Sequence, residues 1–215
     1  MSKSLIDLSV SEFLAKLAGA DATPGGGCAA ALSGALSASL VTMVSGLTAG
    51  KKGFGDIAET LEILDEQGQQ MMQSLAAAVD ADAAAYGGVM KAFGMPKGTD
   101  EEKTERSKAI QEAMKQAAEV PLAVATESLA SAELGMVALE KGNPNAASDA
   151  AVGVLHALTG VEGASLNVII NLESIKDAEY VEAKRKEVEE LLTAAKGIRT
   201  ELWEHLRSKL STLPR

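Results

Sequence analysis

The chain has 215 residues, enough for one large domain or two small ones, and 47% of them are hydrophobic. Its formal net charge of −10 argues against a nucleic-acid-binding protein, because such proteins carry a basic surface. A single cysteine excludes an internal disulfide, and the N-terminus shows no apolar signal-peptide core, so we expect a cytoplasmic protein.

The first half of the chain predicts three helices. Ser9 and Glu12 have the spacing of a capping box, which opens a short amphipathic helix over residues 9–19. A second helix is expected over residues 25–49, where no charged residue occurs and Ala, Gly, Ser, Leu and Val dominate. Such a helix is buried on most sides, and its small residues favour close packing. A long helical pattern predicts the third helix over residues 56–93.

The second half predicts three more helices. A capping box at 99–102 opens a helix to about residue 140, with a bend or break expected near Pro121. The apolar run 146–172 is interrupted by polar and charged side chains, so it indicates a buried helix rather than a membrane span. A charged amphipathic helix follows over residues 177–211. We therefore expect one all-α domain, residues 1–215, in which long helices surround the small-residue-rich helix.

The turn before the second helix, Pro24 to Gly27, begins the pattern G-x-G-x-x-A, which is formed by Gly25, Gly27 and Ala30. That pattern marks a dinucleotide site only after a strand and with an acidic residue about 20 positions later. Here a helix precedes it and no acidic residue follows before Asp56, so a nucleotide site is excluded. Two interpretations stay open. The bare backbone of Gly25, Gly26 and Gly27 receives a polar edge of a ligand through unpaired N–H groups, or the turn only connects packed helices.

Asp82 is the acidic residue most indicative of chemistry. It lies on the apolar stripe of the 56–93 helix between Val79 and Tyr86, and no basic residue is within one turn. Asp80 is expected to face elsewhere. Burial without a partner raises the pKa of a carboxyl group, which suits a general acid or base near neutral pH. The alternative is a structural carboxylate satisfied by a distant hydroxyl, amide or lysine.

Two groups of polar residues adjoin the apolar helices. Lys51 and Lys52 follow the second helix, where they either stabilise its C-terminus or form a basic patch for an anionic substrate. The other group, at the start of the 146–172 helix, consists of Asn143, Asn145, Ser148 and Asp149. Asn145 or Ser148 is the expected helix cap, and Asp149 either caps too or points into a polar pocket.

The histidines and the cysteine indicate no metal site. With one cysteine and two distant histidines, the chain offers no zinc-ligand set and no catalytic Cys–His pair. His156 is interpreted as a core histidine that hydrogen-bonds to a neighbour.

Five segments of the sequence occur in the order and approximate spacing of one known family. They are TPGGGCAAALSGALSASLVTMVSGLTAGKK, DADAAAY, MPKGTDEEK, KGNPNAASDAAV and SLNVIINL. On these motifs the chain resembles the folate cyclodeaminase/cyclohydrolase family over about residues 9–210. Its members are methenyltetrahydrofolate cyclohydrolases and formiminotetrahydrofolate cyclodeaminases, which often form the C-terminal half of a bifunctional enzyme.

The resemblance implies an all-α fold, a homodimer or higher homo-oligomer, and a folate site near the glycine turn. It places Asp82 on the family's acidic catalytic position, and Lys51 on a basic pair that binds the folate carboxylate tail or assists proton transfer. The substrate-binding residues that it implies are Pro24, Gly25, Gly26, Gly27, Lys52, Asn143, Asn145, Ser148 and Asp149. No metal or bound cofactor is implied, because the folate is the substrate, and no nucleic acid or membrane partner is expected. Whether one subunit supplies the whole site stays open.

Both reactions of the family pass through a tetrahedral carbon that bears nitrogen leaving groups. The cyclohydrolase adds water to 5,10-methenyltetrahydrofolate and yields 10-formyltetrahydrofolate, whereas the cyclodeaminase expels ammonia and forms the methenyl compound. The chain carries no formiminotransferase domain, so we expect the cyclohydrolase of one-carbon metabolism, with the cyclodeaminase of histidine degradation as the alternative. A different class of function is a helical scaffold without catalytic activity. The unpaired Asp82 and the lysine pair argue against it.

Overall fold

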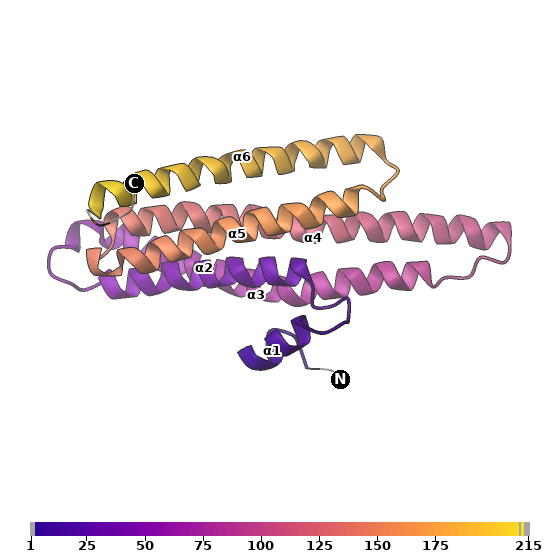
Figure 1. Ribbon diagram of the computed structural model, residues 1–215, viewed down its shortest axis with the longest axis horizontal. Helices are drawn as coiled ribbons and strands as arrows, with labels where there is room; N and C mark the ends of the chain where they lie inside the picture. The colour runs from indigo at the N-terminus through magenta and orange to yellow at the C-terminus, as the bar shows by residue number, and fades with distance from the viewer. Residues whose placement is uncertain (1–2, 211, 213–215) are drawn as a thin grey trace.

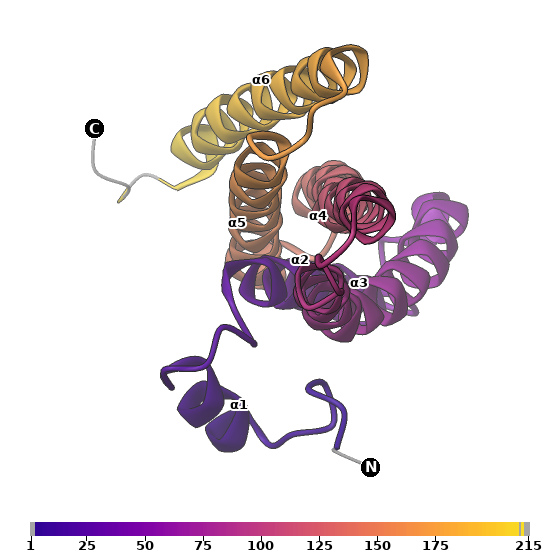
Figure 2. The same cartoon turned by 90° about the vertical axis from the view of Figure 1, so that its right-hand side faces the viewer.

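The computed structural model describes residues 3–210 and 212, and this part of the chain is helical and has no strand. The helices are, in chain order, α1 (Val10–Leu17), α2 (Gly26–Thr48), α3 (Ala58–Phe93), α4 (Asp100–Lys141), α5 (Ala147–Leu172) and α6 (Ala178–Lys209), with short 3-10 turns η1 (Gly55–Ile57) and η2 (Pro144–Ala146). Helices α2 to α5 run side by side along the long axis, α6 covers one edge, and α1 lies apart on the opposite side (Figures 1 and 2). The all-α prediction is confirmed.

The helix starts follow the capping chemistry of the sequence. The Ser9 hydroxyl accepts a hydrogen bond from the backbone N–H of Glu12, whose carboxylate accepts one from the Ser9 N–H at 2.7 Å. Thr99 and Glu102 make the same reciprocal pair at the start of α4, and Asp177 caps α6. Both predicted capping boxes are confirmed, because each pair satisfies two N–H groups that the helix leaves free.

Helix α2 lies at the centre of the bundle and packs against α3, α4 and α5. Its small residues permit this. A Cβ atom added at Gly34 would lie 2.5 Å from the Ser128 hydroxyl oxygen of α4, and one added at Gly160 of α5 would lie 2.6 Å from it. Three helix backbones therefore approach one another around Ser128, which confirms the predicted buried, small-residue-rich helix.

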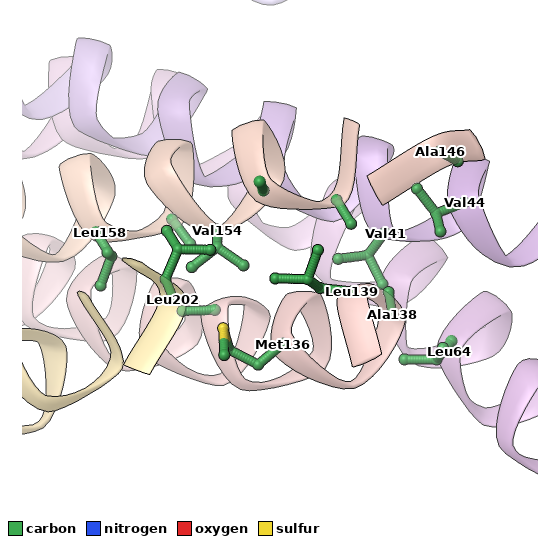
Figure 3. Packing of buried hydrophobic residues seen from close by; sticks show 14 of the residues in the cluster. Val41, Val44, Leu64, Met136, Ala138, Leu139, Ala146, Val154, Leu158 and Leu202 are labelled. Carbon is green, nitrogen blue, oxygen red and sulfur yellow. The ribbon is translucent and has the colours of Figure 1, made fainter. Parts of the chain in front are cut away.

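The largest hydrophobic cluster joins α2 to α6. Figure 3 shows side chains from all five helices meeting in it: Val41, Val44, Leu64, Met136, Leu139, Val154, Leu158 and Leu202. Leu202 of α6 is fully buried there. The charged helix α6 thus contributes its apolar side to the bundle, as the amphipathic pattern predicted.

Of the predicted bend or break near Pro121, the break is wrong, because α4 continues through this residue as one helix. A proline inside a helix leaves the carbonyl four residues earlier without its backbone donor. That carbonyl belongs to Ala117, and the side-chain amide of Asn171 on α5 donates to it at 2.8 Å. A neighbouring helix therefore supplies a hydrogen bond in place of the missing one, and α4 continues without a break.

The start of α5 also differs from the prediction. Neither Asn145 nor Ser148 caps this helix, which begins at Ala147 directly after η2 and has Ala146 as its N-cap residue, without a side-chain cap. Asn143 takes that function one step earlier, since its side-chain oxygen accepts from the N–H of Asn145 at 3.1 Å and caps η2. The inserted 3-10 turn shifts the capping position towards the loop.

Within the described residues, three helices, α2, α4 and α5, are long and apolar enough to cross a membrane by length and composition alone. In the bundle, 61%, 56% and 50% of the residues in their apolar windows are buried. Their apolar side chains therefore pack largely against one another, as expected for the core of a helical bundle.

Candidate active site

The glycine turn forms the N-terminus of α2. Gly25 is the N-cap residue in extended conformation, and no side chain caps this end. The first hydrogen bond of the helix runs from the N–H of Ala29 to the carbonyl of Gly25. The N–H groups of Gly26, Gly27 and Cys28 therefore have no carbonyl partner within the helix and carry the positive end of its dipole.

Asp82 of α3 faces this turn. A Cβ atom at Gly27 would collide with the Asp82 carboxylate, so the carboxylate occupies the space that a side chain would fill. The Cys28 thiol donates a hydrogen bond to Asp82 Oδ2 at 3.2 Å. Burial raises the pKa of Asp82 above its usual range, and the hydrogen bonds from Cys28 offset part of that increase. The predicted inward orientation of Asp82 and its raised pKa are both confirmed.

A cavity of about 360 Å³ opens in front of Asp82 and the glycine turn, within the size range of small-molecule sites. Val79, one stripe position before Asp82, is fully buried, whereas Tyr86, one position after, is 42% exposed. The apolar stripe of α3 therefore changes from core to cavity wall at Asp82. The further wall residues include Met90 and Phe93 of α3 and Met114 and Ala117 of α4.

Two asparagines of α5 complete the cavity, and the sequence reasoning missed both. The side-chain amide of Asn167 donates to the carbonyl of Gly163 at 2.8 Å and lies beside Gly26. Asn171, which bonds to Ala117, stands one turn further along. Two amides four residues apart in an apolar helix were the available signal, because that spacing puts both on one face.

Lys51 and Lys52 lie far from this cavity in the same chain. They follow the C-terminus of α2, whose 23 residues span about 35 Å, whereas the glycine turn precedes its N-terminus. Both lysines are exposed, and Lys51 lines a separate hollow of about 680 Å³ with Phe54 of the α2–α3 connection. One chain therefore does not bring the predicted lysine pair to Asp82.

The group at the start of α5 lies at the lysine end as well (Figure 1). Asn143 is buried and joins that end to α2, since its N–H donates to the Thr48 hydroxyl at 2.9 Å. Asn145 and Ser148 are exposed, and Asp149 is half-buried. These polar residues therefore lie at the C-terminal end of α2, as the lysine pair does. The cavity lies at the N-terminal end of the same helix.

Three other residues that the sequence analysis named, Pro24, Asp80 and His156, do not line the cavity. Pro24 is buried beside the turn. Asp80 faces away from Asp82 and accepts a hydrogen bond from the N–H of Leu5 at 2.7 Å, which attaches the N-terminal segment. His156 is half-buried and hydrogen-bonds through Nδ1 to the Ser33 hydroxyl at 3.1 Å, as predicted for a histidine satisfied by a neighbour.

Comparison with known proteins finds relatives along nearly the whole chain. A family profile described as formiminotransferase-cyclodeaminase matches residues 9–190. A methenyltetrahydrofolate cyclohydrolase from Methylorubrum extorquens is 40% identical over 203 residues, which cover 94% of this chain and 98% of that protein. A formimidoyltransferase-cyclodeaminase from Rattus norvegicus is 36% identical over 90% of this chain, and the match spans only 36% of that longer protein.

A solved structure shares the fold. The crystal structure of formiminotetrahydrofolate cyclodeaminase from Thermotoga maritima matches with a TM-score of 0.84 and 29% identity. The match covers 94% of this chain and 97% of that one. The similarity therefore extends over the helical bundle as a whole rather than over one motif.

Proposed function

We propose that this chain, which belongs to the formiminotransferase-cyclodeaminase family, is a methenyltetrahydrofolate cyclohydrolase that converts 5,10-methenyltetrahydrofolate to 10-formyltetrahydrofolate. The observation that carries the proposal is the half-buried Asp82 carboxylate, which faces the open N-terminus of α2 across a ligand-sized cavity. The 40% identity to a cyclohydrolase of nearly the same length favours this reaction over the related one.

The cavity suits a substrate with a polar ring and an attached aromatic ring. The free N–H groups of Gly26 and Gly27 can donate to ring oxygen or nitrogen atoms, and the oxygen of Asn167 can accept from ring N–H groups. Tyr86 and Phe93 present apolar surface for the aromatic part. The ring system would lie between these polar and apolar walls, next to the Asp82 carboxylate.

Asp82 would serve as general base and then as general acid. The amidinium carbon of the substrate bears a positive charge, which the carboxylate stabilises at close range. Asp82 takes a proton from water as the water oxygen bonds to this carbon. It returns the proton to N5 as the bond from that nitrogen to the carbon breaks. The remaining hydroxyl proton goes to solvent as the formyl group forms.

We further propose that the active enzyme is a homodimer in which each site combines two chains. A two-fold interface that pairs α2 with its copy in antiparallel orientation exchanges the two ends of this helix. The lysine end of one protomer then adjoins the glycine turn of its partner. In this arrangement Lys51 and Lys52 would bind the folate carboxylate tail, and Asn145, Ser148 and Asp149 would contact its polar groups.

Exposed apolar side chains on α2 and α5 support such an interface. They are between 39% and 67% exposed: Leu36, Met43, Leu47, Val152, Leu166 and Ile170. The hydrogen bond between Ser33 and His156 shows that these two helices are adjacent. Large exposed apolar patches mark protein contact sites. We propose a second copy of this chain as the partner, because it would also bring a lysine pair to the glycine turn.

The direct test is turnover of 5,10-methenyltetrahydrofolate and formiminotetrahydrofolate side by side near neutral pH. Loss of methenyl absorbance that depends on the enzyme supports the cyclohydrolase. Formation of that absorbance with release of ammonia from the formimino substrate would instead assign the cyclodeaminase, which the Thermotoga maritima relative favours. Catalysis of neither reaction would overturn both assignments. We also propose that activity survives removal of metal ions by a chelator, because Asp82 supplies both proton transfers in this mechanism and the substrate carbon already bears the positive charge that attracts water.

A further inference from the structure

Cys28 is the one cysteine of the chain and lies beside the candidate catalytic group. It is fully buried in the first turn of α2, with its sulfur 3.2 Å from Asp82 Oδ2. Burial, together with the nearby Asp82 charge, raises the pKa of its thiol to about 12. The group is therefore protonated at neutral pH and donates its hydrogen to the carboxylate. A nucleophilic role is excluded, since a nucleophile needs an accessible thiolate.

We propose that Cys28 is a positioning residue, whose thiol holds Oδ2 of Asp82 so that Oδ1 is presented to the substrate and its attacking water. The part of this inference that concerns catalysis rests on the proposed function. The part that concerns the thiol–carboxylate contact does not.

Two donors of Cys28, its thiol and its backbone N–H, reach the Asp82 carboxylate. The backbone N–H remains in any variant at this position, so the thiol is the donor that a substitution removes. Among the side chains that the structure describes, the Cys28 thiol is the hydrogen-bond partner of Asp82, and no ion pair fixes this carboxylate. The missing side chain at Gly27 gives the carboxylate room beside the N-terminus of α2. A thiol is a weak donor, although a hydrogen bond to an ionised acceptor is stronger than one between neutral groups.

The thiol also acts on the protonation state of the carboxyl group. Burial raises the pKa of Asp82, and the hydrogen bond from Cys28 lowers it. Removing the donor therefore raises the pKa further and leaves less carboxylate at neutral pH. A general base needs the carboxylate form, so Cys28 supports both the orientation and the charge of Asp82.

The experiment compares Cys28→Ala, which removes the donor, with Cys28→Ser, which keeps one. Val41→Ala serves as the matched control, because it shortens another buried side chain of α2 away from the cavity. The Asp82 carboxyl is titrated by carbon-13 NMR in the ligand-free protein, with Asp82→Asn to assign its signal. The kcat, KM and pH profile of methenyltetrahydrofolate hydrolysis are measured in parallel.

We expect Cys28→Ala to raise the pKa of Asp82, move the acidic limb of the kcat profile to higher pH and lower kcat by about tenfold to a hundredfold. KM should change little. Cys28→Ser should restore most of kcat and the wild-type pH profile. Val41→Ala should lower thermal stability without moving either quantity.

Two outcomes overturn the proposal. One is a Cys28→Ala protein with an unchanged Asp82 titration and unchanged kcat. The other is equal loss in Cys28→Ala and Cys28→Ser with no change of the pH profile, which would give Cys28 a packing role only. If the wild-type protein hydrolyses neither folate, the proposed function fails, and the NMR titration still decides whether the thiol controls the carboxyl.

Discussion

A shared site makes a sharp prediction about mixed dimers. Asp82 and the lysine pair stand near opposite ends of α2, a separation of about 35 Å along this 23-residue helix. Two side chains cannot bridge that distance to one small ligand. If both act on the same substrate, they must come from different protomers.

The perturbation uses two variants, each defective at one end. Asp82→Asn removes the proposed base, and Lys51→Ala combined with Lys52→Ala removes the proposed tail contact. We expect the first to lower kcat by about a hundredfold or more. The second should lower kcat/KM by about tenfold or more, which corresponds to about 1.4 kcal/mol.

The assay uses heterodimers purified through two different affinity tags. A heterodimer of the two variants has one site with both defects and one site with neither, so it should show about half the wild-type activity at low substrate concentration. The control joins a wild-type chain to a chain that carries all three substitutions. In a shared arrangement each of its sites has one defect, and its activity should be low.

The opposite pattern would refute the shared site. If one chain supplied each complete site, the first heterodimer would show low activity, since each of its sites would carry one defect, and the control would keep about half the wild-type activity. A protein that stays monomeric in solution while fully active would refute the arrangement as well.

Four further predictions test single contacts. Asp82→Asn should fold, and its unfolding free energy should increase relative to that of the wild type as the pH rises above 3.8. Burial raises the pKa of the Asp82 carboxyl in the folded state, so ionisation of this group destabilises the wild-type fold, whereas asparagine does not ionise. Denaturation at several pH values measures this difference. Gly26→Val should keep its thermal stability but bind folate less tightly by calorimetry, since an added Cβ meets only Asn167 at 3.5 Å, and unchanged binding would remove the glycine turn from the site. Asn171→Ala should lose about 1–3 kcal/mol in urea denaturation, because it leaves a buried carbonyl of α4 without its donor. Leu166→Glu should shift the protein from dimer to monomer in sedimentation, and an unaffected dimer would place the interface elsewhere.

The sequence predicts most helix boundaries because local chemistry determines them. The reciprocal pairs at Ser9 and Thr99 fix the starts of α1 and α4, and their spacing is visible without any tertiary contact. The path of α4 through Pro121 was not predictable in this way, since the donor that rescues the helix, Asn171, lies 50 residues further along. Contacts of that kind appear only when the helices are assembled.

In the candidate site, too, local features could be predicted from the sequence and tertiary ones could not. The sequence predicts that Asp82 points inward, because the regular period of a helix determines which side chains share a face, and Asp82 shares its face with apolar residues of α3. The sequence does not show at which end of the bundle each polar group lies. The lysine pair follows the C-terminus of α2, where Asn143 hydrogen-bonds to Thr48, whereas Asp82 lines the cavity at the N-terminus of the same helix. This relation is determined by the antiparallel packing of α2 against α3 and α5 (Figure 1).

The glycine turn has a more specific role than exposure of backbone to a ligand. Gly27 is buried, and the space without a side chain is occupied by the Asp82 carboxylate rather than by solvent. Gly26, its neighbour, is exposed and borders the cavity. The two glycines therefore meet two different requirements of the proposed site. Gly27 lets the Asp82 carboxylate approach the N-terminus of α2, and Gly26 leaves open space on the side of the cavity. An alanine at 27 should displace Asp82 and abolish catalysis, whereas an alanine at 26 should chiefly weaken binding, and comparing kcat with KM for the two variants distinguishes these effects.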